Sequence, residues 1–206
     1  MTYADFTLDG VMDQFGLRVV SKPSVFAVAA PITLSALLRD TLAESLPLAW
    51  SVGTDKARAE LITSPVLMEI WRQFGGQISL FSGVDFTVDA EAVLSGVCDF
   101  LFSLSPLQLI VQTPVVAVVE AKNDNIKSCI GQCVAEMLAA QRFNAVRDAA
   151  LPSVYGAVTT GSNWKFLRLT DTTVTIDEAE YYITQPERIV GLLVSMIREA
   201  QESQNE

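Results

Sequence analysis

Three charged side chains lie in segments of the chain that are otherwise apolar. Asp99 interrupts residues 96–102, and Glu120 and Lys122 end the apolar run of residues 115–119. If that run is a strand, the alternation of side chains places Glu120 and Lys122 on the same face. Because buried charges are costly unless they are paired or bind a metal, this pattern indicates a site with two carboxylates and one lysine.

The chemistry of such a site depends on how the two segments pair. If residues 93–104 and 115–122 form antiparallel neighbours, Asp99 and Glu120 approach one point, where a divalent cation would relieve their repulsion. A one-residue slip of the register would turn Asp99 to the opposite face of the sheet. The alternative without a metal is a strand-to-strand ion pair of Asp99 and Lys122 beside Glu120.

The composition excludes several other mechanisms. The chain has no histidine, so a Ser-His-Asp triad, a Cys-His pair and an imidazole metal ligand are impossible. Its three cysteines provide no disulfide framework. Cys129 and Cys133 would share a helix face, but zinc needs more ligands, which favours buried apolar thiols. Carboxylates, lysine and a hard cation with oxygen ligands remain available.

Charge and hydropathy limit the partners and the compartment. The net charge of −10 argues against indiscriminate binding to phosphate backbones, although residues 122–170 hold six basic against three acidic residues. The N-terminus lacks the basic region of a signal peptide. Residues 25–38 are apolar but contain Pro31 and are too short to span a bilayer. We expect no membrane association and a cytoplasmic location.

Hydrophobic periodicity predicts an alternation of helices and strands along the 206 residues. Predicted helices cover residues 5–16, 31–46, 54–72, 128–147 and 186–201. Predicted strands cover residues 78–88, 93–104, 115–122, 154–160, 164–169 and 173–183. Pro31 should open the second helix and Thr54 should cap the third, which Pro65 should kink or divide. These elements predict an α/β fold in which helices flank a central mixed sheet.

The predicted organisation is one compact unit with two parts. Residues 1–53 form an N-terminal, mainly helical extension packed on the core, and residues 54–206 form the domain that holds the charged residues. The apolar segment from Pro23 to Leu38 either packs on its own domain, which we favour, or mediates assembly into a homo-oligomer.

The arrangement of these charged residues resembles the PD-(D/E)XK nuclease superfamily, which includes restriction endonucleases. The resemblance covers roughly residues 55–170 and rests on Asp99, then Glu120-Ala121-Lys122 at the end of the next strand, then a helix. Glu60 matches an acid that many members carry on the preceding helix, and Gln132 matches a polar residue on the following helix. The chain departs from the recombination-nuclease subgroup by having Glu136 instead of a tyrosine.

The resemblance implies a restriction-endonuclease-like core and a metal-dependent phosphodiesterase that acts on nucleic acid, with DNA as the first candidate. It implies that Asp99, Glu120 and the Ala121 carbonyl hold Mg²⁺ or Mn²⁺, with Glu60 contributing through water. Lys122 would orient the attacking water, and Gln132 would position the substrate or Lys122. The alternative is a catalytically inactive nuclease fold that serves as a binding or scaffolding protein.

Overall fold

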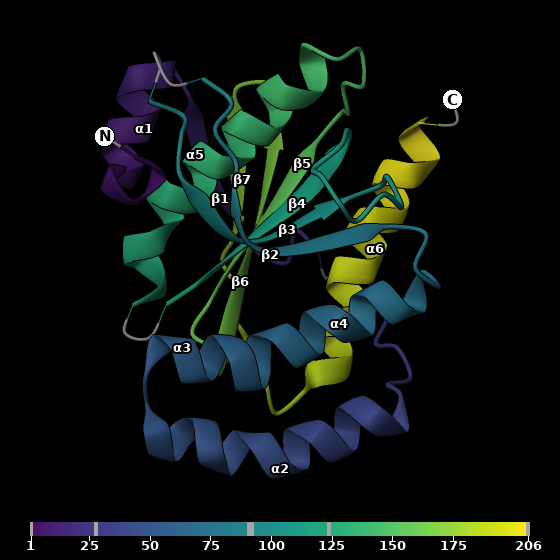
Figure 1. Ribbon diagram of the computed structural model, residues 1–206. Helices are drawn as coiled ribbons and strands as arrows, with labels where there is room; N and C mark the ends of the chain where they lie inside the picture. The colour runs from purple at the N-terminus through teal and green to yellow at the C-terminus, as the bar shows by residue number, and fades with distance from the viewer. Residues whose placement is uncertain (1, 27–28, 90–92, 123–124, 205–206) are drawn as a thin grey trace.

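The structure is a computed structural model that describes residues 2–26, 29–89, 93–122 and 125–204. Its centre is a mixed sheet of eight strands in the order β1-β7-β6-β5-β4-β3-β2, with β8 paired to β6 (Figure 1). The strands are β1 (Arg18–Lys22), β2 (Ser79–Asp85), β3 (Val97–Ser103), β4 (Val115–Ala121), β5 (Val154–Thr159), β6 (Asn163–Thr170), β7 (Thr173–Asp177) and β8 (Tyr181–Tyr182).

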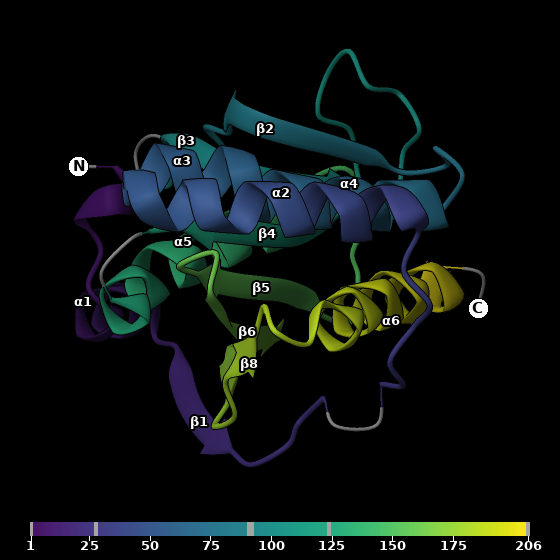
Figure 2. The same cartoon turned by 90° about the horizontal axis from the view of Figure 1, so that it is seen from below.

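Helices cover both faces of this sheet, as the α/β prediction requires. They are α1 (Leu8–Phe15), α2 (Ala36–Val52), α3 (Asp55–Arg58), α4 (Ser64–Gln73), α5 (Ile126–Ala145) and α6 (Pro186–Gln204), with a 3-10 turn η1 (Tyr3–Asp5) and a π-helical segment η2 (Ala59–Thr63). One core lies between the sheet and helices α2, α4 and α6, and the other lies between the sheet and helices α1 and α5. Figure 2 shows α2 running beside α3 and α4.

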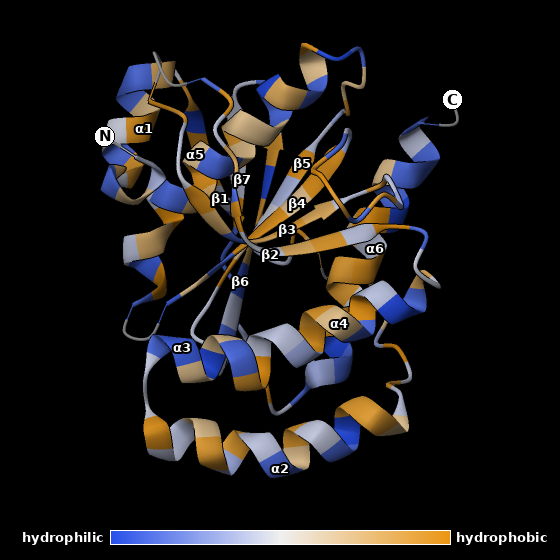
Figure 3. Ribbon diagram, viewed as in Figure 1, coloured by the Kyte–Doolittle hydropathy of each residue, from blue (hydrophilic) through white to orange (hydrophobic). Residues whose placement is uncertain are grey.

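The strands nearest the predicted site are the most buried part of the sheet. Every residue of β4 and of β5 is buried, and the central strands are mostly hydrophobic in Figure 3. β2, β3 and β4 pair as antiparallel neighbours, whereas β4 and β5 are parallel. A parallel pair needs a crossover connection, which α5 supplies.

The helix predicted at residues 54–72 is present but divided into α3, η2 and α4. Thr54 caps it as predicted, because its Oγ1 accepts a hydrogen bond of 3.2 Å from the Ala57 N–H. The division precedes Pro65, whose ring conflicts with the carbonyl of Leu61 four residues earlier. That carbonyl accepts a hydrogen bond of 2.6 Å from Ser45 Oγ instead.

Three predicted elements differ most from the structure in how they are divided or where they begin. The first helix is divided into η1 and α1, and the last strand is divided into β7 and β8. The second helix begins at Ala36 after the cap Ser35, so the prediction that Pro31 opens it is wrong. The reason is a contact that is distant in sequence, since Glu69 accepts hydrogen bonds from the backbone N–H and the hydroxyl of Ser35.

The N-terminal segment is part of the same sheet. β1 forms one edge and pairs parallel with β7. From the apolar segment Pro23 to Leu38, Leu34 and Leu38 are buried in the core beside α6, whereas Leu37 is exposed; residues 27 and 28 lie outside the described residues. Among the described residues, no helix is both long and apolar enough to cross a membrane.

Candidate active site

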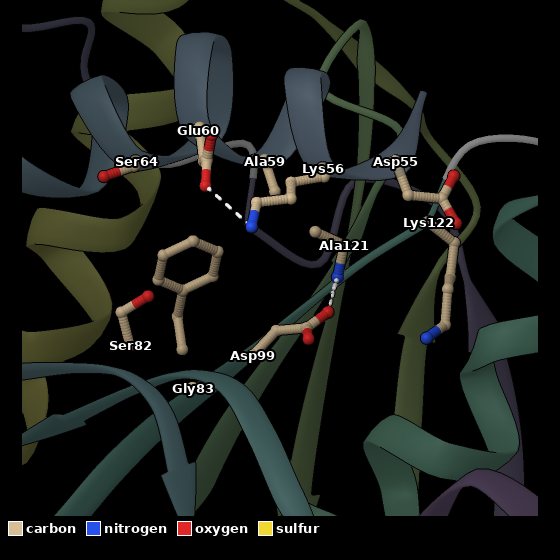
Figure 4. Close-up of a pocket in the computed structure, with 11 residues that line it drawn as sticks. Asp55, Lys56, Ala59, Glu60, Ser64, Ser82, Gly83, Asp99, Ala121 and Lys122 are labelled. Carbon is tan, nitrogen blue, oxygen red and sulfur yellow. Dashed lines mark hydrogen bonds and ion pairs between the residues drawn. The ribbon is translucent and has the colours of Figure 1, made fainter. Parts of the chain in front are cut away.

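Asp99 and Glu120 lie at the same point of the sheet. β3 and β4 pair with Phe100 opposite Val119, so continuing this register places Asp99 opposite Glu120. The backbone ladder ends there, and Asp99 Oδ2 accepts a hydrogen bond of 2.9 Å from the Ala121 N–H, as Figure 4 shows. The condition set by the sequence, an antiparallel pairing without a register slip, is therefore met, and the two carboxylates converge.

Glu120 is a buried carboxylate with incomplete hydrogen bonding. Its side chain has no exposed surface, and Lys122 Nζ lies 2.9 Å from its Oε1. Its Oε2 receives no hydrogen bond from any described residue. Burial and the nearby Asp99 carboxylate raise the pKa of Glu120 to about 7, although the Lys122 ammonium opposes this shift. The carboxylate is thus held in surroundings that favour a bound proton or cation.

Lys122 directly follows β4 and contacts Glu120, so the third predicted residue joins the first two. Its side chain is half-buried, and burial by itself would lower its pKa. The hydrogen bond to Glu120 and the charges of Glu120 and Asp99 outweigh burial, so the pKa of Lys122 is raised. Lys122 therefore keeps its positive charge beside the two carboxylates.

The middle of α5 supplies a second buried acid, Glu136, which the sequence identified only as a departure from a nuclease subgroup. Glu136 is fully buried, and burial together with the charge of Glu120 raises its pKa well above the usual range. Gln132 Nε2 donates a hydrogen bond of 3.1 Å to Glu136 Oε1. The side-chain amide of Gln132 is thus directed to Glu136, and its positioning of the substrate or of Lys122 stays a prediction.

Glu60 lies across a cavity from Asp99 (Figure 4). The cavity has a volume of about 450 Å³, and its wall includes Glu60, Asp99, Ala121 and Lys122. Glu60 belongs to the π-helical segment before Pro65, is 64% exposed and lies 3.7 Å from Lys56 Nζ. The structure therefore brings Glu60 to the same cavity as Asp99, Ala121 and Lys122, but on the opposite wall and in an ion pair, whereas Glu120 is not among the residues that line this cavity.

The residues at this point provide part of the ligand set of a hard cation. Asp99, Glu120 and the Ala121 carbonyl offer oxygen donors of the kind that Mg²⁺ prefers. The unpartnered Oε2 of Glu120 and the repulsion between the two carboxylates both fit a bound cation. Within the described part of the chain, no group of three or more histidine, cysteine, aspartate or glutamate side chains is arranged to hold a metal.

The three cysteines, unlike these carboxylates, do not form a candidate metal site. Cys98, Cys129 and Cys133 are buried and free, and burial raises the pKa of each thiol. Thiolates, which are the form that binds zinc, are thereby disfavoured. The cysteines pack as small apolar side chains in the core between the sheet and α5.

Comparison of the chain with protein-family models, with curated proteins and with solved structures returned no match. The geometry described above is therefore the basis for the functional argument.

Proposed function

We propose that this protein is a metal-dependent phosphodiesterase of the PD-(D/E)XK type that acts on nucleic acid, with DNA as the first substrate to test. The observation that carries the proposal is the convergence of Asp99 and Glu120 on adjacent strands, with Lys122 Nζ 2.9 Å from Glu120 at the wall of a cavity. The antiparallel strands β2, β3 and β4, followed by the α5 crossover to the parallel strand β5, support a restriction-endonuclease-like core.

The reaction in this proposal is hydrolysis of a phosphodiester. A water oxygen bonds to phosphorus while the bond from phosphorus to the leaving sugar oxygen breaks, and the proton lost by water reaches solvent as the leaving oxygen gains one. Asp99, Glu120 and the Ala121 carbonyl would hold Mg²⁺ or Mn²⁺, which when bound supplies charge stabilisation on the phosphate. Lys122 orients the water and stabilises the negative charge that develops on the phosphate oxygens.

Cleavage assays with Mg²⁺ or Mn²⁺ test the proposal on single-stranded and double-stranded DNA and RNA. We expect Lys122→Ala to reduce the cleavage rate by at least about a hundredfold, because one charge-stabilising group is lost. Lys22→Ala is the matched control, since Lys22 is an exposed lysine on β1 at the edge of the sheet. Cleavage that is unchanged in Lys122→Ala would remove the basis for the assignment.

A catalytically inactive binding or scaffolding protein is the second candidate. The net charge of −10 favours it, as does the ion pair that already occupies Lys122 and Glu120. The discriminating measurement is the melting temperature with and without Mn²⁺, because a ligand at 100 times its Kd stabilises the folded state by about 2.7 kcal/mol. The phosphodiesterase proposal expects a rise that Asp99→Asn abolishes. No rise, together with no binding of nucleic acid at low salt, favours the second candidate.

Assembly into a homo-oligomer is a separate proposal. Leu34 and Leu38 are buried within the chain, so much of the apolar segment that motivated it is already covered. A molecular mass in solution equal to that of a single chain would exclude the oligomer.

A further inference from the structure

Two cavities meet at Lys122. The first, of about 450 Å³, lies between α3 with η2 on one side and β2 with β3 on the other. The second, of about 250 Å³, lies beside the start of α5 and is lined in part by Asn125, Ser128 and Gln132. Asp55 and Lys122 line both cavities, and Figure 4 shows these two side chains at one side of the first. A phosphodiester beside Lys122 would therefore have one cavity on each side of it.

The sizes and surfaces of the two cavities suit unpaired nucleosides. Small-molecule sites have volumes of roughly 300 to 1,000 Å³, so the first cavity is in the usual range and the second is slightly below it. Phe100, whose side chain is mostly packed in the core, contributes an apolar part of the first wall against which an unpaired base can lie. The amide and hydroxyl groups of Asn125, Ser128 and Gln132 offer hydrogen bonds to the polar edges of a base or sugar in the second cavity.

The charges around the first cavity do not suit a duplex. Proteins that hold duplex DNA neutralise several phosphates with lysine and arginine. The lysines of this wall are Lys56 and Lys122, and each lies within ion-pair distance of a glutamate, at 3.7 Å from Glu60 and 2.9 Å from Glu120. Asp55, Glu60 and Asp99 add negative charge around the same cavity. A second strand with its phosphates would be repelled there.

We propose that the substrate is single-stranded nucleic acid, bound with the scissile phosphodiester beside Lys122, one nucleoside in the cavity of Phe100 and the next in the cavity of Ser128. This inference rests on the proposed phosphodiesterase function. It assigns the substrate class, which the charged residues alone do not.

The test compares four substrates of one length in the presence of Mn²⁺: oligo(dT), oligo(U), a blunt DNA duplex and a blunt RNA duplex. We expect one of the single strands to be cleaved at least about a hundredfold faster than the duplex of the same sugar, and the oligo(dT) and oligo(U) rates decide between DNA and RNA. A duplex cleaved as fast as the single strand overturns the substrate inference alone. No cleavage of any substrate overturns the phosphodiesterase proposal, and the substrate inference with it.

Tryptophan substitutions test the two cavities separately. Ser82 lines the first cavity and Ser128 the second, and both are exposed, so each site can accept a larger side chain without disturbing the core. We expect Ser82→Trp and Ser128→Trp each to reduce kcat/KM for the single strand at least about tenfold, mainly through KM. Ser21→Trp, at an exposed position on the opposite edge strand β1, is the control and should leave kcat/KM unchanged.

The pattern of effects identifies the cavity in use. If Ser128→Trp retains the wild-type kcat/KM while its melting temperature shows that it is folded, the second nucleoside does not occupy that cavity and the inference is wrong. The same result for Ser82→Trp excludes the first cavity.

Discussion

Glu69 and Glu120 are both glutamates without exposed surface, but their surroundings are opposite. The Glu69 carboxylate accepts hydrogen bonds from the Ser35 N–H at 2.9 Å, the Ser35 hydroxyl at 2.6 Å and Gln73 Nε2 at 3.1 Å. Burial would raise its pKa, but these hydrogen bonds and Arg72 outweigh it, so the pKa of Glu69 is lowered. Glu120 has one lysine, one opposing carboxylate and an unpartnered oxygen, and its pKa is raised.

This difference separates a structural carboxylate from a candidate functional one. Glu69 connects α4 to the start of α2, and its hydrogen bonds compensate for the loss of water. Glu120 is compensated only by Lys122 and is opposed by Asp99, so its charge costs stability in the absence of a cation. Carboxylates whose pKa is strongly raised are concentrated at functional sites. Carboxylates with several hydrogen bonds, such as Glu69, are typical of positions that stabilise the fold.

The largest expected difference between the two glutamates is in catalysis. In Glu120→Gln, we expect cleavage to fall about a thousandfold, which corresponds to about 4 kcal/mol of activation free energy, because a cation ligand loses its charge. Glu69→Gln should retain most of the activity in its folded fraction, since the Glu69 carboxylate contacts Ser35, Gln73 and Arg72 and not Lys122. The measurement is kcat/KM with Mn²⁺, and equal losses in both variants would contradict the distinction.

The second difference is the dependence of stability on pH without divalent cations. The pKa of Glu120 is raised from 4.5 to about 7, so its contribution to stability is complete below pH 4.5 and is lost as the pH rises through 7. The loss is on the order of 3 kcal/mol, at about 1.4 kcal/mol for each pKa unit. Urea unfolding in EDTA should show a fall in the wild type, and Glu120→Gln should remove the part due to Glu120, while Glu136, whose pKa is also raised, keeps contributing.

Glu69 should give the opposite trend in the same experiment. Its lowered pKa means that its contribution is present above the pKa of the unfolded chain and is lost as the pH falls. The unfolding free energy of the wild type should therefore exceed that of Glu69→Gln by a larger amount as the pH rises. Parallel pH profiles for the two variants would show that their surroundings do not differ as described.

The third difference is in stability at neutral pH. Glu69→Ala leaves the partly buried N–H and hydroxyl of Ser35 without their partner, which should cost about 2 kcal/mol of unfolding free energy. Glu120→Gln should be neutral or stabilising by about 1 kcal/mol in metal-free buffer, because the removal of the buried charge relieves its desolvation and its repulsion by Asp99, and the half-buried Lys122 remains in contact with solvent. Urea unfolding at pH 7 measures both, and a larger loss in Glu120→Gln would contradict the comparison.

The sequence predicted the parts of the fold and site that depend on local pattern. The order of helices and strands, the Thr54 cap and the convergence of Asp99 and Glu120 follow from periodicity, cap chemistry and strand alternation. These features involve residues that are neighbours in sequence or on consecutive strands. The division of the helix at η2 belongs to the same class, because Pro65 produces it locally.

The parts that the sequence did not predict depend on contacts between distant residues. The start of α2 at Ala36 is set by Ser35 and Glu69, which are 34 residues apart. The role of Glu136 was missed because α5 is buried over most of its circumference, so its apolar stripe gives no indication of which polar residue faces the site. A glutamate among apolar residues on such a helix, four residues after Gln132, was the available signal.

The smallest expected effect on stability concerns the backbone carbonyl of Leu61. Like the Glu69 carboxylate, this carbonyl accepts a hydrogen bond from a distant serine, but it lies on the divided helix beside the cavity. Pro65 removes its usual helical partner, and Ser45 Oγ replaces that partner at 2.6 Å. Ser45→Ala should therefore cost about 1 kcal/mol of unfolding free energy. Ser51→Ala is the matched control, because the exposed Ser51 hydroxyl bonds only to Pro47 O in its own helix, and its removal should cost little. Equal losses in urea unfolding would mean that the Ser45 hydrogen bond does not stabilise the divided helix.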